Sequence, residues 1–249
     1  MVIELHEAFQ LNGKRVLITG GTTGVGRATA LLLARQGCRV FICGRDAAHL
    51  EDALGEIKGG GGMAEGMAGD VGTEEGIASI FAAADAWLGG LDIAVLNAGI
   101  GAKGELTEMS HAECARVVSV NLLSCISCAK EAMHRMAGRR GDIVMTGSMS
   151  AEVADERSAV YVATKAGVRG FAASLRKEAN PLGVRVSLVE PGSIGSDMVD
   201  ETPERQREMN AGGLMLRAED VARAILFMLV QPDWCDVIKL QIRPHLQLI

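Results

Sequence analysis

The sequence predicts an α/β fold with a doubly wound, mostly parallel sheet. Short apolar segments alternate with longer helical patterns along the whole chain, as in successive βαβ units. The first apolar segment, 16–18, ends in a glycine cluster, and a helical pattern follows directly. The chain has 249 residues and contains neither a repeat nor a convincing linker. These observations favour a single domain over residues 1–249.

Several predicted elements have a boundary signal. Gly37 closes the first helix, and Thr73 caps the third. Glu219 and Asp220 complement the dipole of the last helix. Four glycines at 59–62 follow a helix rather than a strand, so we interpret them as a flexible turn. The predicted strands are 16–18, 39–43, 63–67, 91–96, 141–148, 184–189 and 237–242, and the predicted helices are 27–36, 47–58, 73–88, 110–136, 159–178 and 217–230.

The composition excludes several classes of protein. Hydrophobic residues make up 48% of the sequence and aromatic residues only 3%, which predicts a sizeable aliphatic core. The formal net charge of −6 provides no general attraction to nucleic acid or to an anionic membrane. No apolar run reaches the roughly 18 residues that cross a bilayer, and the N-terminus lacks the pattern of a signal peptide. We therefore expect a cytoplasmic protein whose partners include neither a membrane nor a nucleic acid.

The turn after the first strand has the composition of an anion site. Gly20, Gly24 and Gly26 lie between this strand and the first helix. Glycine permits close approach of the backbone to a pyrophosphate, and the free N–H groups and the dipole of the helix favour its charge. An ordinary tight turn is the alternative. The spacing also differs from G-x-G-x-x-G, because three residues separate Gly20 from Gly24.

Tyr161 and Lys165 are candidates for proton transfer. They are four residues apart on a predicted helix and therefore share one face. A neighbouring ammonium favours the phenolate, which lowers the tyrosine pKa from its usual value of about 10. Ser148 ends the fifth predicted strand, and Asn121 lies within a helix upstream. Taken alone, Tyr-x-x-x-Lys would more often mark a solvated helix face.

The order and spacing of these residues resemble those of a known family. The chain is similar to single-domain short-chain dehydrogenases/reductases in Thr19-Gly20-x-x-x-Gly24-x-Gly26, Asp70, Asn97-Ala98-Gly99, Asn121, Ser148, Tyr161-x-x-x-Lys165 and Pro191-Gly192. The resemblance covers about residues 11–242. It implies a three-layer Rossmann fold with seven strands and an oxidoreductase that uses a nicotinamide cofactor.

The resemblance also implies a role for each candidate catalytic residue. Tyr161 is expected to be the general acid in carbonyl reduction and the base in alcohol oxidation. Lys165 is expected to lower the pKa of Tyr161 and to hold the nicotinamide ribose. Ser148 would hydrogen-bond the substrate oxygen, and Asn121 would hold a water in a proton relay to Lys165. The implied reaction interconverts a secondary alcohol and a ketone.

The same resemblance implies a cofactor site that prefers NADP(H), with NAD(H) as the alternative. Gly44 stands where NAD users of the family tend to have aspartate, and Arg45 can pair with a 2′-phosphate. The alternative for Arg45 is a solvated side chain beside Asp46. The expected cofactor-binding residues are Gly20, Thr22, Thr23, Gly24, Val25, Gly26, Gly44, Arg45, Asp70, Val71, Asn97, Ala98, Gly99, Tyr161, Lys165, Pro191, Gly192, Ile194 and Ser196.

Two features depart from the family pattern. Many members carry a threonine after Pro-Gly that contacts the nicotinamide carboxamide, and here Ser196 is the nearest hydroxyl equivalent. Many members also end in a Gly-Gly-rich tail, whereas this chain has the sequence 237–244 instead. That tail and the segment 218–222 are similar to the branch with NADP-dependent 3-hydroxy acid (serine-type) dehydrogenases, a likeness that leaves the substrate open.

Two other functions compete with an oxidoreductase. A cofactor-sensing or scaffolding protein without activity is the first alternative, although such a protein would be expected to lack one of the four catalytic residues. A sugar-nucleotide epimerase would need a substantial C-terminal substrate domain. Cys125 and Cys128 form a C-x-x-C inside a predicted helix, where small buried side chains are the favoured interpretation. No residue pattern predicts a metal site.

The family and the residue pattern also suggest an assembly and a lid. The helices with Asn121 and Tyr161 are expected to pair in a homodimer or homotetramer. On the Tyr161 helix, small side chains at Val162, Ala166, Gly170 and Ala173 permit close contact between helices, or else face the sheet. The segment 193–213 is expected to be a mobile substrate lid with a short helix that starts after Thr202, and a surface loop unconnected to binding is the alternative.

Overall fold

The computed structural model describes residues 11–195 and 202–247 of the chain. Its centre is one seven-stranded sheet in the order β3-β2-β1-β4-β5-β6-β7, with every pair parallel. The predicted mostly parallel α/β fold is therefore confirmed. The strands are β1 (Arg15–Thr19), β2 (Arg39–Gly44), β3 (Met63–Ala68), β4 (Ile93–Leu96), β5 (Gly141–Thr146), β6 (Val184–Pro191) and β7 (Lys239–Ile242).

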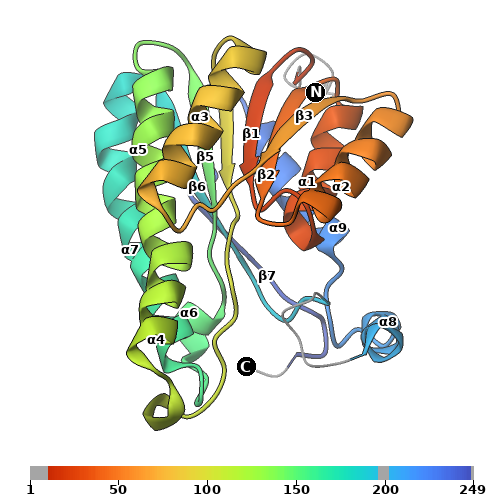
Figure 1. The fold of residues 1–249 in the computed structure, drawn as a ribbon, viewed down its shortest axis with the longest axis vertical. Helices are drawn as coiled ribbons and strands as arrows, with labels where there is room; N and C mark the ends of the chain where they lie inside the picture. Colours follow the sequence, from red (N-terminus) through yellow and green to blue (C-terminus); the bar gives the residue numbers. More distant parts are fainter. Residues whose placement is uncertain (1–10, 196–201, 248–249) are drawn as a thin grey trace, which may run out of the picture.

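Helices cover both faces of the sheet, which gives three layers (Figure 1). One face carries α1 (Gly24–Arg35), α2 (Ala47–Gly59) and α9 (Ala218–Leu229). The other carries α3 (Glu74–Leu88), α4 (His111–Val118), α5 (Ser124–Met136) and α7 (Ala159–Ala179). The short α6 (Ser150–Val153) and α8 (Pro203–Ala211) lie at the lower edge in Figure 1, where the strands end.

Side chains of the strands point alternately into two aliphatic cores. Along β1, Leu17 belongs to the core under α3, α5 and α7, whereas Val16 and Ile18 belong to the core under α1, α2 and α9. All three are fully buried. A strand buried on both faces has no polar alternation, and so the strands are short continuous apolar runs in the sequence.

Most predicted boundaries agree with the structure. The hydroxyl of Thr73 accepts a hydrogen bond from the Gly76 amide at 3.0 Å, which confirms this residue as the cap of α3. Gly37 has φ +82°, a left-handed conformation suited to glycine after a helix. Four strands differ by two residues at one end: β4 begins at Ile93, β5 ends at Thr146, β6 ends at Pro191, and β7 begins at Lys239. Apolar residues before β4 and β7 pack in or against the core, although they do not continue the hydrogen-bond ladder of the sheet.

The predicted helix 110–136 is not a regular α-helix. A π-helical turn, Ser119–Leu123, separates α4 from α5 and contains Asn121. The segment His111–Met136 is long and apolar enough to cross a membrane by length and composition alone. The apolar window of this segment is 39% buried in the fold, and Val117, Cys128 and Ala132 are among its buried residues.

Candidate active site

The glycine turn brings the start of α1 against the end of β1. Gly20 and Gly24 have φ values of +64° and +51°, in the left-handed region that favours glycine. A Cβ at Gly26 would collide with the Gly20 carbonyl and approach Nδ2 of Asn97 to 2.7 Å. The third glycine is therefore required by the packing of the helix on the strand.

Asn97 joins three neighbouring strands below this turn. Its Nδ2 donates to the Gly20 carbonyl at 3.2 Å, and its Oδ1 accepts from the Thr146 hydroxyl at 3.2 Å. Its backbone N–H donates to the Thr19 hydroxyl at 3.1 Å. These bonds fix the ends of β1, β4 and β5 relative to one another, and so they hold the floor of the site in one shape.

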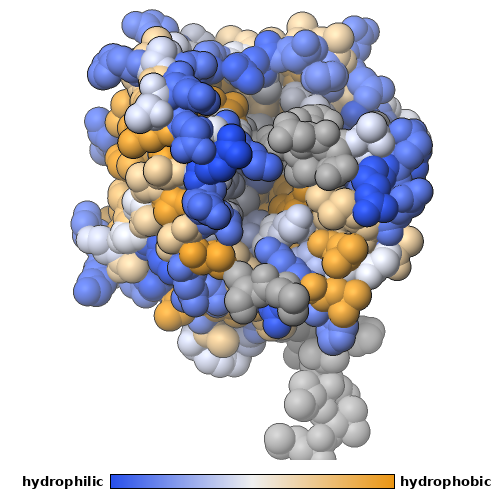
Figure 2. Space-filling view, turned by 90° about the horizontal axis from the view of Figure 1, so that it is seen from below, coloured by the Kyte–Doolittle hydropathy of each residue, from blue (hydrophilic) through white to orange (hydrophobic). Residues whose placement is uncertain are grey.

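A pocket with a volume of about 890 Å³, here the Arg45 pocket, lies beside the glycine turn. It opens beside the ends of β1, β2, β3 and β4, and its lining includes Gly20, Gly44, Arg45, Asp70 and Val71. Figure 2 views this edge from below and shows a central hollow with hydrophilic residues on its rim. The crevice outside the carboxyl ends of the strands is where open α/β sheets bind their ligands.

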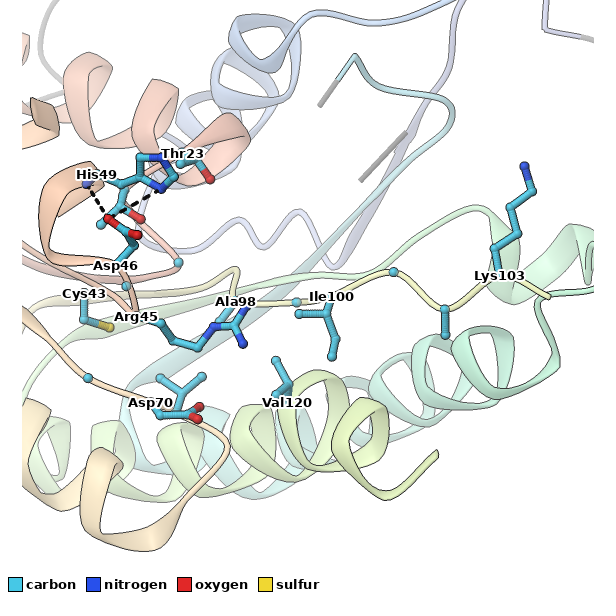
Figure 3. A pocket seen from close by; sticks show the side chains of 18 of the residues that line it. Thr23, Cys43, Arg45, Asp46, His49, Asp70, Ala98, Ile100, Lys103 and Val120 are labelled. Carbon is cyan, nitrogen blue, oxygen red and sulfur yellow. Dashed lines mark hydrogen bonds and ion pairs between the residues drawn. The ribbon is translucent and has the colours of Figure 1, made fainter. Parts of the chain in front are cut away.

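Arg45 points across the pocket toward Asp70 and Ala98 (Figure 3). The side chain is exposed and forms no direct ion pair with a carboxylate of the described residues, although its charge helps to lower the pKa of Asp70. Asp46 does not neutralise it, because its carboxylate accepts from the His49 amide at 2.9 Å and caps α2. A Cβ at Gly44 would collide with the buried Thr22 hydroxyl. Without rearrangement there is consequently no room for a carboxylate side chain at position 44.

Asp70 is held in place by Arg116 from α4. The Arg116 guanidinium lies 2.8 Å from Oδ2 of Asp70, and the Gly72 amide donates to Oδ1 at 2.8 Å. Burial tends to raise the pKa of Asp70, but the hydrogen bonds from Arg116 and Gly72 outweigh this effect, so the pKa is lowered below its usual value. The carboxylate therefore stays ionised at the edge of the pocket near neutral pH.

Tyr161, Lys165 and Ser148 lie together in a second, narrower space, here the Tyr161 cavity, with a volume of about 180 Å³. Lys165 is only 4% exposed, and its Nζ donates to the Thr146 carbonyl at 2.9 Å. The same Nζ lies 5.7 Å from the centre of the Tyr161 ring. The structure thus brings the predicted pair to one cavity with the lysine charge beside the ring.

Ser148 lies two residues beyond β5 rather than at the strand end that the sequence predicts. It is buried, and its hydroxyl accepts from the Ser150 amide at 3.1 Å. This contact uses an acceptor site and leaves the hydroxyl hydrogen to donate to another group. Pro191, Gly192 and Ile194 complete the same cavity.

Asn121 is buried and pairs with the backbone of Ile100. Its Oδ1 accepts from the Ile100 amide at 2.8 Å, and its Nδ2 donates to the Ile100 carbonyl at 2.9 Å. A Cβ at Gly99 would lie 3.5 Å from this Oδ1 and 3.7 Å from Nζ of Lys165. The π-helical turn thus presents Asn121 to the loop after β4, beside Lys165.

A third space, here the Met149 cavity, opens from Tyr161 and Ser148 and has a volume of about 400 Å³. Met149, Val153 and Ile194 contribute apolar surface to its lining. Polar groups are present as well, and the Ser150 hydroxyl donates to Asp155 at 3.3 Å. The cavity is suited to a small molecule with both apolar and polar parts.

Several residues of the site are absent from the sequence predictions. Arg116 holds Asp70, His49 lines the Arg45 pocket, and Gln247 lines the Met149 cavity. The Gln247 side chain accepts from the Ser193 amide at 3.0 Å, so the C-terminal segment folds back onto the loop after Pro191-Gly192. Nothing in the local sequence marks these side chains, because only the tertiary fold brings them to the site.

The proposed lid is described only in part. Ser196 and the rest of 196–201 lie outside the described residues. The predicted short helix is present as α8, and the Thr202 hydroxyl caps it by accepting from the Arg205 amide at 3.3 Å. The two ends of the segment meet in an isolated bridge between Ile194 and Leu216.

Cys125 and Cys128 are buried free thiols on α5, as the structural interpretation of the C-x-x-C predicts. Burial raises the pKa of Cys125 to about 12 and also raises that of Cys128. Both remain protonated at neutral pH, so neither is an activated redox thiol.

The shape and chemistry of these spaces fit a dinucleotide. The Arg45 pocket and the Tyr161 cavity share Gly20, Ala98 and Gly99, and the Tyr161 and Met149 cavities share Ser148 and Gly192. A continuous path therefore runs from Arg45, past the glycine turn, to Tyr161. Gly20 and Gly24 have no side chain, and a Cβ at Gly24 would meet nothing within 4 Å, so the backbone at the start of α1 is open to a pyrophosphate.

Comparisons with known proteins agree with this geometry. Residues 14–207 match the model of the short chain dehydrogenase family. The chain is 34% identical over 223 residues to the 3-oxoacyl-[acyl-carrier-protein] reductase FabG of Pseudomonas aeruginosa, a match that covers 88% of this chain and 90% of that protein.

Two solved structures show the same fold with a cofactor bound. A short chain dehydrogenase from Burkholderia cenocepacia in complex with NADP has a TM-score of 0.83 and 28% identity, over 94% of this chain and 98% of that one. The 3-ketoacyl-(acyl-carrier-protein) reductase from Brucella melitensis complexed with NADH has a TM-score of 0.84 and 28% identity, over the same shares. With the family match and the assembled Tyr161 cavity, these similarities establish that the chain belongs to the short-chain dehydrogenase/reductase family of NAD(P)-dependent oxidoreductases.

Proposed function

We propose that the protein is an NADP(H)-dependent oxidoreductase that interconverts a secondary alcohol and a ketone. The main support is the convergence of Tyr161, Lys165 and Ser148 on the cavity that continues into the Arg45 pocket. A bound nicotinamide supplies or accepts the hydride, and the protein provides position and proton transfer. We expect the enzyme to act in the cytoplasm as one domain.

Tyr161 moves the proton in this proposal. In the direction of reduction, its hydroxyl protonates the carbonyl oxygen of the substrate, and in oxidation its phenolate removes the alcohol proton. Lys165 stabilises the phenolate from its position beside the ring, and Ser148 donates a hydrogen bond to the substrate oxygen. Asn121 fixes the Ile100 backbone, and the proposed water relay runs beside it to Lys165.

The preference for NADP(H) rests on the Arg45 pocket. An NAD site usually places a carboxylate at the end of the second strand, where it binds the ribose 2′-hydroxyl. Here Gly44 occupies that position against Thr22, and the adjacent Arg45 offers an unpaired guanidinium to a 2′-phosphate. One of the two related structures holds NADP and the other holds NADH, so they favour neither cofactor. The proposed preference therefore rests on Gly44 and Arg45 alone.

The substrate class follows from the Met149 cavity. Its lining combines Met149, Val153 and Ile194 with the amide of Gln247 and the Ser150 hydroxyl. This mixture favours a ketone with an apolar body and at least one further polar group, such as a 3-oxo acid or ester. The Pseudomonas relative is named a 3-oxoacyl-[acyl-carrier-protein] reductase, which supports this proposed class.

A panel of ketones, 3-oxo acids and quinones, followed by NADPH absorbance, tests the reaction. We expect turnover with members of the first two groups. Tyr161→Phe keeps the ring and removes the transferable proton, so turnover should fall by about 10²-fold or more while NADPH binding persists. Near-normal turnover in this variant would remove Tyr161 from the reaction, and a failure to bind NADPH would point to misfolding instead.

A further inference from the structure

A fully buried carboxylate lies one residue from the active-site loop. Glu190 is 0% exposed and directly precedes Pro191-Gly192 at the end of β6. Arg169 on α7 pairs with it in a forked geometry, with Nε donating to Oε1 at 2.7 Å and Nη2 donating to Oε2 at 2.9 Å. The reaction proposed above assigns no role to either residue.

This pair is the centre of a larger network. The same Nη2 of Arg169 donates to Glu152 of α6 at 3.3 Å. Gln241 of β7 donates to Glu152 at 2.7 Å and to Glu190 at 3.0 Å. One guanidinium and one amide therefore connect α6, α7, β6 and β7 at a single point.

Each of the connected elements carries part of the active site. Tyr161, Lys165 and Arg169 follow one another at intervals of four residues, so they lie along one side of α7. The Met149 amide, next to Ser148, donates to the Pro191 carbonyl at 3.0 Å. The network thus lies directly behind the loops that carry the substrate-facing groups.

Glycines in these loops pack closely against the network. A Cβ at Gly147, the residue before Ser148, would lie 3.0 Å from Cγ of Glu190. The Gly192 amide donates to the Ile242 carbonyl at 2.7 Å, next to Gln241. A shift of the Glu190 side chain would therefore be transmitted to both Ser148 and Gly192.

We propose that Arg169 and Glu190 are positioning residues, which set the catalytic side of α7 relative to the loops at Ser148 and Pro191-Gly192. The inference rests on the proposed function. A bidentate guanidinium–carboxylate pair fixes both the distance and the rotation between its two elements, which a single hydrogen bond does not. Rate is sensitive to this alignment, because a misplacement of about 1 Å can reduce turnover by about 10²-fold.

The chain offers a matched control at the amino ends of the strands, opposite the ends that form the site. Arg15 pairs with Asp92 in the same forked geometry, with Nε to Oδ2 at 2.8 Å and Nη2 to Oδ1 at 2.7 Å. Arg15 starts β1 and Asp92 precedes β4, so this pair lies away from the strand ends that form the site. Loss of either pair should weaken the fold, but only loss of the Arg169–Glu190 pair should alter the reaction.

The test compares Arg169→Met/Glu190→Gln with Arg15→Met/Asp92→Asn. Each double variant removes both charges, so neither leaves a buried charge without a partner. For the first we expect kcat to fall about tenfold or more on the best ketone of the panel. Its dissociation constant for NADPH should stay within about threefold of wild type, because the Arg45 pocket is intact. The control should retain kcat within about twofold despite a lower melting temperature.

Hydrogen exchange provides a readout that does not depend on turnover. In the NADPH complex, amides of 147–153 and 192–195 should exchange faster in Arg169→Met/Glu190→Gln and remain unchanged in the control. Unchanged exchange in both segments would overturn the inference, as would a kcat within about twofold of wild type or an equal loss of kcat in the control. If no ketone of the panel is reduced by wild type, the proposed reaction fails, and the exchange measurement still decides this inference.

Discussion

At the scale of a single residue, we propose that Arg45 sets the cofactor preference. Its guanidinium lies in the pocket without a carboxylate partner among the described residues, so a 2′-phosphate would gain an ion pair there. Arg45→Ala should therefore weaken NADPH binding by about tenfold and leave NADH binding nearly unchanged. Fluorescence titration of each cofactor measures both effects.

Arg35 supplies the control for this substitution. It is exposed at the far end of α1, so Arg35→Ala changes the net charge equally without entering the pocket. Its cofactor affinities should match those of wild type. Equal affinity of the wild-type protein for NADH and NADPH, or an Arg45→Ala variant that binds NADPH as tightly as wild type, would contradict the proposed preference.

The site residues that can be predicted from the sequence are those that belong to a short sequence motif. Gly20, Tyr161 and Lys165 follow from motifs, and the structure brings them to connected cavities. Arg116 and Gln247 could not be predicted in this way. Each reaches the site from a distant element, and an arginine on a helix or a glutamine near a chain end has no local pattern that reveals its partner.

The junction of β1 and α1 gives a prediction at the scale of secondary-structure elements. Gly26→Ala should destabilise the protein by about 1–3 kcal/mol, because its methyl group would overlap the Gly20 carbonyl. It should also weaken cofactor binding, since the glycine turn must move to relieve the clash. Thermal unfolding and NADPH titration measure the two effects.

Gly55→Ala on α2 is the matched substitution for this prediction. Gly55 is exposed, and a Cβ there meets nothing within 4 Å. Alanine should stabilise this helix by about 0.5–1 kcal/mol, because it restricts the unfolded chain without a clash. A Gly26→Ala protein as stable as Gly55→Ala would show that close helix packing is not what requires glycine at position 26.

α8 is the element expected to move when ligands bind. Glu204, Arg205 and Arg207 are exposed on it, and the bridge between Ile194 and Leu216 closes its base. Amides of 202–213 should exchange rapidly in the free protein and more slowly with NADP(H) and a substrate analogue bound. Exchange that stays the same on saturation with both ligands would identify the segment as a surface loop unconnected to binding.

The sequence predicts which helices and strands exist better than it predicts where each of them begins and ends. Patterns of apolar residues place α4 and α5 in one helix, and the π-helical turn between them is not evident from that pattern. The turn inserts one extra residue into a helix without changing its composition. It is stabilised by tertiary contacts, such as those of Asn121 with Ile100, which a local pattern cannot reveal.

At the scale of the whole molecule, the sequence predicts the architecture well. Strands that alternate with helices require crossovers, and crossovers produce a parallel sheet with helices on both faces. The position of the site follows, because the order in which the chain adds strands reverses between β1 and β4, and open α/β sheets bind their ligands in the crevice at this point. The alternation of strands and helices does not by itself determine which helix faces remain exposed once the helices have packed on the sheet.

One such face is on α7. Ala166, Gly170 and Ala173 are exposed rather than turned to the sheet, and a Cβ at Gly170 meets nothing within 4 Å. The neighbouring segment of α4 and the π-helical turn exposes Val118 and Leu123 at 42% and 53%. Small side chains that permit close helix contact, next to exposed apolar ones, favour association of two copies through this surface.

We therefore expect a homodimer, or a homotetramer that contains this dimer, with α7 packed against its copy. Gly170→Arg should dissociate this contact, because two arginines would meet near the two-fold axis in a space that accepts only small side chains. Gly55→Arg adds the same side chain to an exposed position of α2 and should leave the assembly intact. Light scattering at micromolar protein measures the mass of each variant. A monomeric wild-type protein, or a Gly170→Arg variant with the wild-type mass, would show that the exposed face of α7 is not an interface.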